Sequence, residues 1–169
     1  LLSRRQRQMC IRDRIQTAKK QGSQILYMEV GDRLISGDLR LQCVGPTQAI
    51  SRDFAADCNA MSLCLLLTCG DFQGLFTGDI AMDQEASLVA EVQSALGENG
   101  TLAFLKVAHH GSKYSSGEDF LDALAPKIAL ISCGKNNSYG HPGKETLERL
   151  EDVMGKDDIY ITMDAGQIR

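Results

Sequence analysis

All three histidines of this 169-residue chain lie in glycine-marked loops, each after an apolar run that reads as a strand. His109 and His110 follow residues 102–108, and His141 stands in a later loop of the same kind. Asp79 occupies an equivalent position after a third apolar run. Because neighbouring parallel strands end at one edge of a sheet, the pattern predicts a layered α/β fold that gathers these side chains. One carboxylate and several imidazoles are the donors that a hydrolytic metal centre needs.

The charge of the chain is unevenly distributed. Residues 1–20 hold seven of the 18 Lys and Arg side chains and one acid, so residues 21–169 carry 11 basic and 21 acidic side chains, a net charge of −10. A domain with this net negative charge does not bind a polyanion by bulk electrostatics. If the chain handles nucleic acid, we expect a metal ion and a local basic patch to offset the repulsion. No apolar run approaches the roughly 20 residues of a membrane span.

The six cysteines form no CxxC pair and no regular framework. This favours scattered core thiols in a reducing compartment over a disulfide scaffold or a thiolate zinc site. Cys64 and Cys69 are five residues apart, so in one strand they face opposite sides and do not easily share a metal ion.

The first 14 residues lack an initiating Met and the apolar segment of a secretory signal. We interpret residues 1–14 as a non-native tail, since the string resembles adapter-derived translations at the ends of assembled sequences. A basic arm is the alternative. Residues 15–169 are then a domain, which we expect to be partial.

Hydrophobic periodicity and turn residues predict a strand-rich first half followed by alternating helices and strands. Residues 47–57 read as a loop, and a helix with acids in its first turn ends before Gly97. Ser116, with Asp119 three residues on, predicts a capping box that opens a second helix, and Pro142 suits the first position of a third. The predicted strands are residues 24–30, 39–44, 63–68, 72–76, 102–108, 128–132 and 159–162.

Each candidate residue also has an ordinary structural interpretation. Asp79 is explained by a turn or a helix cap, and His141 by a capping role beside a helix. If the strand continues, His109 and His110 face opposite sides, whereas a break in the strand lets both reach one site. No GxSxG elbow or phosphate-binding P-loop occurs, so serine-triad and nucleotide-hydrolysing classes are disfavoured.

Four motifs occur in order and together resemble the C-terminal metallo-β-lactamase-like domain of the ComEC family of DNA-internalisation competence proteins and its stand-alone relatives. The motifs are Asn59-x-x-Ser62, residues 75–79 (LFTGD), residues 105–112 (LKVAHHGS) and residues 137–142 (NSYGHP). The resemblance runs from about Gln24 to the C-terminus. It implies an αββα sandwich with two metal ions, zinc or manganese, that activate a bridging hydroxide against an ester or phosphodiester.

The resemblance also implies roles for individual residues. Asp79 corresponds to the metal-bridging aspartate, His141 to a ligand, and the pair His109 and His110 to a ligand and a catalytic contact whose assignment stays open. The implied sites are therefore catalytic (His109, His110), metal-binding (Asp79, His110, His141) and substrate-binding (Ser112, Lys113, Asn137).

The chain departs from the family pattern at its start. The first metal motif, HxHxDH or HxDxDH, is absent, because no histidine precedes His109. We therefore expect an incomplete sandwich: a fragment of a metal-dependent phosphodiesterase or nuclease linked to DNA uptake, with weak metal binding, little activity and poor solubility as written. The alternatives are a degenerate non-catalytic module, or a hydrolase of another ester such as a lactonase or phosphorylcholine esterase.

The expected partners follow from the same resemblance. They are a phosphodiester substrate such as DNA, and a membrane channel domain in a ComEC-type parent. Such a parent would be associated with a bacterial membrane, and a stand-alone relative would be cytoplasmic.

Overall fold

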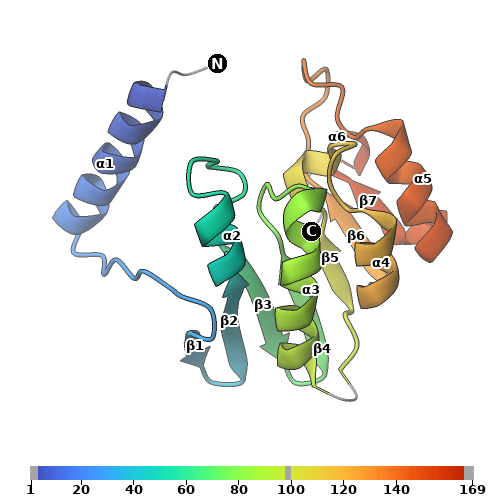
Figure 1. The fold of residues 1–169 in the computed structure, drawn as a ribbon, viewed down its shortest axis with the longest axis horizontal. Helices are drawn as coiled ribbons and strands as arrows, with labels where there is room; N and C mark the ends of the chain where they lie inside the picture. The colour runs from blue at the N-terminus through green and yellow to red at the C-terminus, as the bar shows by residue number, and fades with distance from the viewer. Residues whose placement is uncertain (1–3, 98–99, 166–169) are drawn as a thin grey trace.

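The computed structural model describes residues 4–97 and 100–165, and it contains one seven-stranded sheet with helices packed on it (Figure 1). The strands lie side by side in chain order. Neighbours are antiparallel from β1 to β4 and parallel from β4 to β7. The strands are β1 (Arg33–Ser36), β2 (Leu39–Gly45), β3 (Cys64–Cys69), β4 (Phe72–Phe76), β5 (Phe104–Lys106), β6 (Ile128–Ile131) and β7 (Ile159–Ile161).

Helices connect each pair of parallel strands. The helix α3 (Met82–Leu96) joins β4 to β5, α4 (Glu118–Leu124) joins β5 to β6, and α5 (Lys144–Val153) joins β6 to β7. The predicted α/β class is therefore confirmed. The remaining helices are α1 (Arg4–Lys20), α2 (Gln48–Asp53), α6 (Thr162–Ala165) and the short 3₁₀ turns η1 (Ala108–Gly111) and η2 (Lys156–Asp158).

The hydrophobic core lies between one face of the sheet and the connecting helices. Leu66, Leu75 and Leu105 come from adjacent strands and are at most 1% exposed. They pack in one cluster with apolar side chains of α3, α4 and α5, which are Leu88, Val92, Phe120, Leu121, Leu124 and Leu150. A common cluster means that the three helices cover the same face of the sheet.

The opposite face of the sheet is apolar but carries no helix in the part of the chain that the structure describes. Alternation along the strands directs the neighbours of the core residues to this face. Phe72, Phe76 and Ile128 are 46%, 38% and 37% exposed, and the rings of Phe76 and Phe104 lie 5.8 Å apart. We call these four residues, with Leu65 and Leu67, the open sheet face.

Two predictions for the first half of the chain are wrong. Residues 24–30 form no strand, and Tyr27 among them is 80% exposed. The chain first contacts β2 near Gly31, whose N–H donates to the carbonyl of Cys43. Residues 47–57 are not all loop, because α2 begins after Thr47. The Thr47 hydroxyl accepts the N–H of Ile50, and Ile50 is buried.

Two predicted helix starts are also wrong. Ser116 does not cap α4: it lies in the left-handed region at φ 56°, and Gly117 takes the cap position. Pro142 is not the first residue of α5, since Gly143 caps that helix. The strand expected at 102–108 is confirmed only as the shorter β5, because the backbone turns into η1 at Ala108.

Cys64 is buried and Cys69 exposed, as predicted for opposite sides of a strand, and five cysteines of the described chain are free thiols. The proposed boundary between residues 14 and 15 falls inside α1, which Figure 1 shows apart from the sheet. None of the described helices combines the length and the apolar composition needed to cross a membrane.

Candidate functional site

The sheet topology brings the four candidate residues to one edge. Asp79 follows β4, His109 and His110 follow β5, and His141 lies in the loop after β6. These three strands are parallel neighbours, so their carboxyl ends coincide. The backbone N–H of His109 donates to Gly78 over 3.0 Å, which joins the first two loops directly. We call these four residues the histidine edge.

His110 and Asp79 face one another. The His110 Nε2 and Asp79 Oδ1 atoms are 3.7 Å apart, and both side chains are nearly half exposed. The other ring nitrogen, Nδ1, lies 2.5 Å from the carbonyl oxygen of Ser132. Because a carbonyl only accepts, Nδ1 carries the proton, and in the neutral ring Nε2 presents a lone pair. His110 is thus oriented to accept a proton or bind a cation beside the carboxylate.

Both paired histidines have left-handed backbone conformations. The φ angles are 47° for His109 and 57° for His110. Residues other than glycine seldom adopt this region, and its cost is tolerated where the surroundings enforce it. The strand therefore breaks before the pair, so the predicted alternative in which both histidines reach one edge describes this chain.

His141 lies in a short row of aromatic rings. Its ring centroid is 5.8 Å from that of His109, edge to face, and 5.8 Å from that of Tyr139, nearly parallel. Burial lowers the pKa of His141 below its usual value, and the nearby rings of His109 and His110 lower it further. The His141 ring is therefore neutral at neutral pH, the form that ligates metals or accepts protons.

Asn137 holds the loop that carries His141. Its side-chain oxygen accepts the N–H of His141 at 2.9 Å, and its amide nitrogen donates to the His141 carbonyl at 2.7 Å and to that of Gly134 at 3.0 Å. The side chain of Asn137, predicted to bind substrate, thus makes three hydrogen bonds within its own loop.

The other two predicted substrate residues lie in different surroundings. Ser112 is 4% exposed, and its hydroxyl accepts the N–H of Tyr114, so it lies beneath the loop surface. Lys113 is exposed, and its ammonium lies 5.1 Å from the centre of the Tyr114 ring.

Two glycines allow the loops to approach closely. Gly78 has φ +59°, and a Cβ there would lie 2.5 Å from that of Ser62, whose hydroxyl accepts the N–H of Asp79 at 2.9 Å. Gly111 has φ +79°, and a Cβ there would lie 2.7 Å from that of Pro142. The glycines that mark the motifs are therefore needed for contact between the Asp79 and Ser62 loops, and between the two histidine loops.

Arg149 anchors the segment after the paired histidines. From α5 its guanidinium donates to three carbonyl oxygens of that segment, at 3.1 Å (Lys113), 3.0 Å (Ser115) and 2.8 Å (Ser116). Sequence reasoning missed Arg149, because a single basic residue on a helix carries no signal of a partner some 33 residues away.

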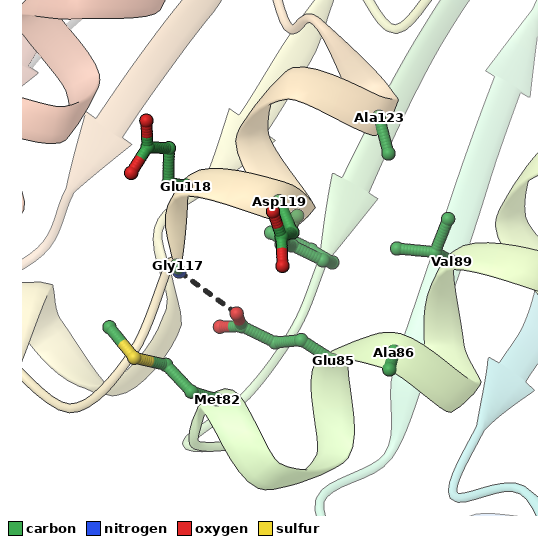
Figure 2. Close-up of a pocket in the computed structure, with 9 residues that line it drawn as sticks. Met82, Glu85, Ala86, Val89, Gly117, Glu118, Asp119 and Ala123 are labelled. Carbon is green, nitrogen blue, oxygen red and sulfur yellow. Dashed lines mark hydrogen bonds between the residues drawn. The ribbon is translucent and has the colours of Figure 1, made fainter.

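Glu85 holds the same segment from the other side. Figure 2 shows it reaching from α3 toward Gly117 at the start of α4. Its carboxylate accepts the N–H groups of Ser116 at 2.5 Å and Gly117 at 2.9 Å. It is 3% exposed, and burial raises the pKa of its carboxyl. The sequence predicted only an acid in the first turn of a helix.

The pocket in Figure 2, of about 430 Å³, lies between α3 and α4. Its lining includes Met82, Glu85 and Asp119 but none of the four residues of the histidine edge. The backbone donors at the start of α4 already have Glu85 as their acceptor, so the pocket offers them to no further anion.

A metal ion would find an incomplete donor set. The Asp79 and His110 pair fits two positions of a divalent ion, since carboxylate and imidazole are suitable ligands. Within residues 4–97 and 100–165, however, no group of three or more His, Cys, Asp and Glu side chains is arranged to hold a metal ion. The residues present therefore fit the implied two-metal site only in part.

The fold and the site define a two-layer α/β protein with an aspartate and histidines at the carboxyl ends of parallel strands. Three relatives have names that refer to competence or recombination. ComE operon protein 3 of Bacillus subtilis is 36% identical over 137 residues, and recombination protein 2 of Haemophilus influenzae is 31% identical over 131 residues. Competence protein ComA of Neisseria gonorrhoeae is 36% identical over 94 residues. These homologues are competence and recombination proteins of the ComEC family.

The alignments cover 81%, 78% and 56% of this chain but only 16%, 15% and 13% of the respective relatives. The chain therefore spans at most about a sixth of the length of these proteins. No protein-family model matches it. The homology supports a link to DNA uptake.

Proposed function

We propose that this chain is part of a metal-dependent phosphodiesterase with a metallo-β-lactamase fold, acting on DNA during uptake. The observation that carries the proposal is the convergence of Asp79, His109, His110 and His141 at one edge of parallel strands. The competence proteins among its relatives supply the DNA context.

The proposed ligands are Asp79, His110 and His141. In this reading the Ser132 carbonyl orients His110, and Asn137 fixes the loop of His141. Divalent ions held by these residues would supply an activated water and neutralise charge on a phosphodiester. His109, beside His141, is the proposed contact to a developing oxyanion or leaving group.

We propose further that residues outside this chain complete the ligand set. The incomplete donor group supports this, as do relatives about six times longer than the aligned segment. The 169-residue chain alone then binds metal weakly and turns over little substrate.

The test compares the chain with the longest natural reading frame that contains it. Both are assayed with bis-p-nitrophenyl phosphate and with DNA, in Mn²⁺ and in Zn²⁺, and metal content is measured after dialysis. We expect hydrolysis by the longer polypeptide and little by the chain. A longer polypeptide without hydrolysis would favour the degenerate binding module. A chain that retains two metal ions and cleaves phosphodiesters would refute the need for further ligands.

A lactonase or phosphorylcholine esterase remains the alternative within the same fold. Adding a lactone and a phosphorylcholine ester to the substrate panel separates these activities, because the proposal requires DNA and the simple phosphodiester to be the preferred substrates.

A further inference from the structure

The row of rings at the histidine edge ends in an open aromatic surface. His109, His141 and Tyr139 succeed one another with 5.8 Å between neighbouring centroids, and Tyr139 lies nearly parallel to His141, at 13°. Tyr139 is nevertheless 69% exposed. One face of its ring is turned to His141, so the exposed area includes the outer face.

The surroundings of this ring differ in charge from the rest of the molecule. Residues 104–117 and 129–144, which contain all three histidines, carry four lysines and no acid, whereas residues 21–169 together have a net charge of −10. Lys144 pairs with Glu148 at 3.0 Å. Lys113 and Lys135 have no ion pair within the described residues and stay available to an anionic backbone.

We propose that Tyr139 is a stacking platform for an unpaired base of a DNA strand whose backbone lies along the histidine edge. This inference rests on the proposed function and specifies its substrate as single-stranded. Proteins that bind single strands combine basic side chains along the backbone with aromatic side chains under the bases. In a duplex the bases are stacked on one another, so a lone surface ring reaches only an unpaired or terminal base.

Tyr114 is the other exposed tyrosine near the site, at 67%. The ammonium of Lys113 lies over its ring at 5.1 Å, so this ring already has a cation on one face. Tyr139 is the better platform because the row of parallel and edge-on rings leads from it directly to the histidines.

The experiment measures binding without turnover. Fluorescence anisotropy of the full chain in EDTA is followed with three labelled probes: a dodecathymidylate, a strand of equal length and charge with abasic sites, and a duplex of equal length. The variants are Tyr139→Ala, Tyr139→Phe and Tyr27→Ala. Tyr27 is the matched control, since it is 80% exposed and lies before β1, outside the site.

The wild-type chain should bind the thymidylate strand more tightly than either other probe. Tyr139→Ala should weaken that binding by about 5- to 150-fold, the size of one base–aromatic stack, and leave the abasic strand unaffected. Tyr139→Phe and Tyr27→Ala should bind like the wild type. Thermal melting of each variant checks the fold.

Equal binding of the thymidylate and abasic strands by the wild type would overturn the platform, as would a Tyr139→Ala variant that binds both unchanged or loses both equally. The outcome is separate from that of the proposed hydrolysis. A longer polypeptide without phosphodiesterase activity would leave Tyr139-dependent binding standing, and one that hydrolyses DNA with no contribution from Tyr139 would remove the platform alone.

Discussion

His110 is held so that one ring nitrogen is committed to the protein and the other is free. The Ser132 carbonyl takes the Nδ1 proton, and Nε2 faces Asp79. Asp79 is itself fixed through its backbone, whose N–H donates to Ser62, rather than through its carboxylate. The groups that position these two residues are therefore distinct from the groups that remain available for chemistry, which are His110 Nε2 and the Asp79 carboxylate.

Replacing Asp79 with alanine should therefore remove activity without removing the fold. In the longer polypeptide, Asp79→Ala should abolish phosphodiester hydrolysis and lower metal content, while the free energy of unfolding changes by no more than about 0.5 kcal/mol, as for other exposed side chains. Asp83→Ala, an exposed acid in the first turn of α3, is the control. Retained turnover would mean that Asp79 is only a turn residue.

At the scale of elements, side chains from α3 and α5 hydrogen-bond to the segment that follows the paired histidines. Glu85 accepts two N–H groups at the start of α4, and Arg149 donates to three carbonyls before it. The segment is thereby fixed through backbone groups on both sides. Left-handed backbone at residues other than glycine, as at His109 and His110, persists where surrounding contacts enforce it.

The stabilisation of the folded chain by Glu85 should depend on pH. Burial raises the folded-state pKa of Glu85 above its ordinary value, so its carboxyl holds its proton more tightly in the folded chain than in the unfolded one. The contribution of protonated Glu85 to the free energy of unfolding is complete below the pKa of Glu85 in the unfolded chain. It is lost as the pH rises through the pKa of Glu85 in the folded chain. The stability difference between wild type and Glu85→Gln, from urea unfolding, should thus shrink from about pH 4.5 upward. A constant difference up to pH 8 would contradict this.

The strand β3 carries thiols of opposite reactivity at its two ends. Burial raises the pKa of Cys64 to about 12, whereas Cys69 is exposed. At pH 8 iodoacetamide should therefore modify Cys69 and the exposed Cys58 but spare Cys64 and the buried Cys43 until the chain unfolds. Peptide mass spectrometry with and without urea measures this. Rapid labelling of Cys64 in the native chain would show that β3 is not covered by α3.

The elements that the sequence predicted well are those with strong local patterns. The hairpin of β3 and β4 follows from two apolar runs joined by a glycine turn, and α3 from its 3.6-residue apolar period. Helix α2 was missed because its cap and one buried Ile50 make a short, weak signal. Residues 24–30 have the composition of a strand, but the described chain provides no partner for them.

The same reasoning applies to the candidate site. Strand ends marked by glycine indicated where Asp79 and the histidines would meet, because parallel topology alone brings strand ends together. Glu85 and Arg149 lay beyond prediction, since each contacts a segment more than 30 residues away and neither changes the local periodicity. The break before His109 depended on backbone conformation, which apolar patterning does not encode.

For the whole molecule, the sheet has one covered and one bare surface. The covered face contains the shared core of α3, α4 and α5. The open sheet face presents aromatic and aliphatic side chains over several adjacent strands. Extended apolar surfaces of this kind drive association or aggregation in water.

The isolated chain should consequently self-associate. Sedimentation velocity should show species larger than the monomer, and the double variant Phe72→Ser/Ile128→Ser should shift them toward the monomer. Both residues lie at the amino ends of their strands, away from the histidine edge. Leu26→Ser, at a residue 51% exposed outside the sheet, is the control. A monodisperse wild-type monomer that melts cooperatively would contradict the prediction.

The change from antiparallel to parallel pairing at β4 has a consequence for the order of folding. Asp79 follows a hairpin that closes over a short loop, whereas the histidines follow β5, which is separated in the chain from its partner β4 by the whole of α3. Local hairpins form quickly, while parallel pairing waits for loop closure over a longer stretch. We therefore expect Asp79 to reach its place before the histidines during folding, so that the histidine edge forms only after β5 has paired with β4.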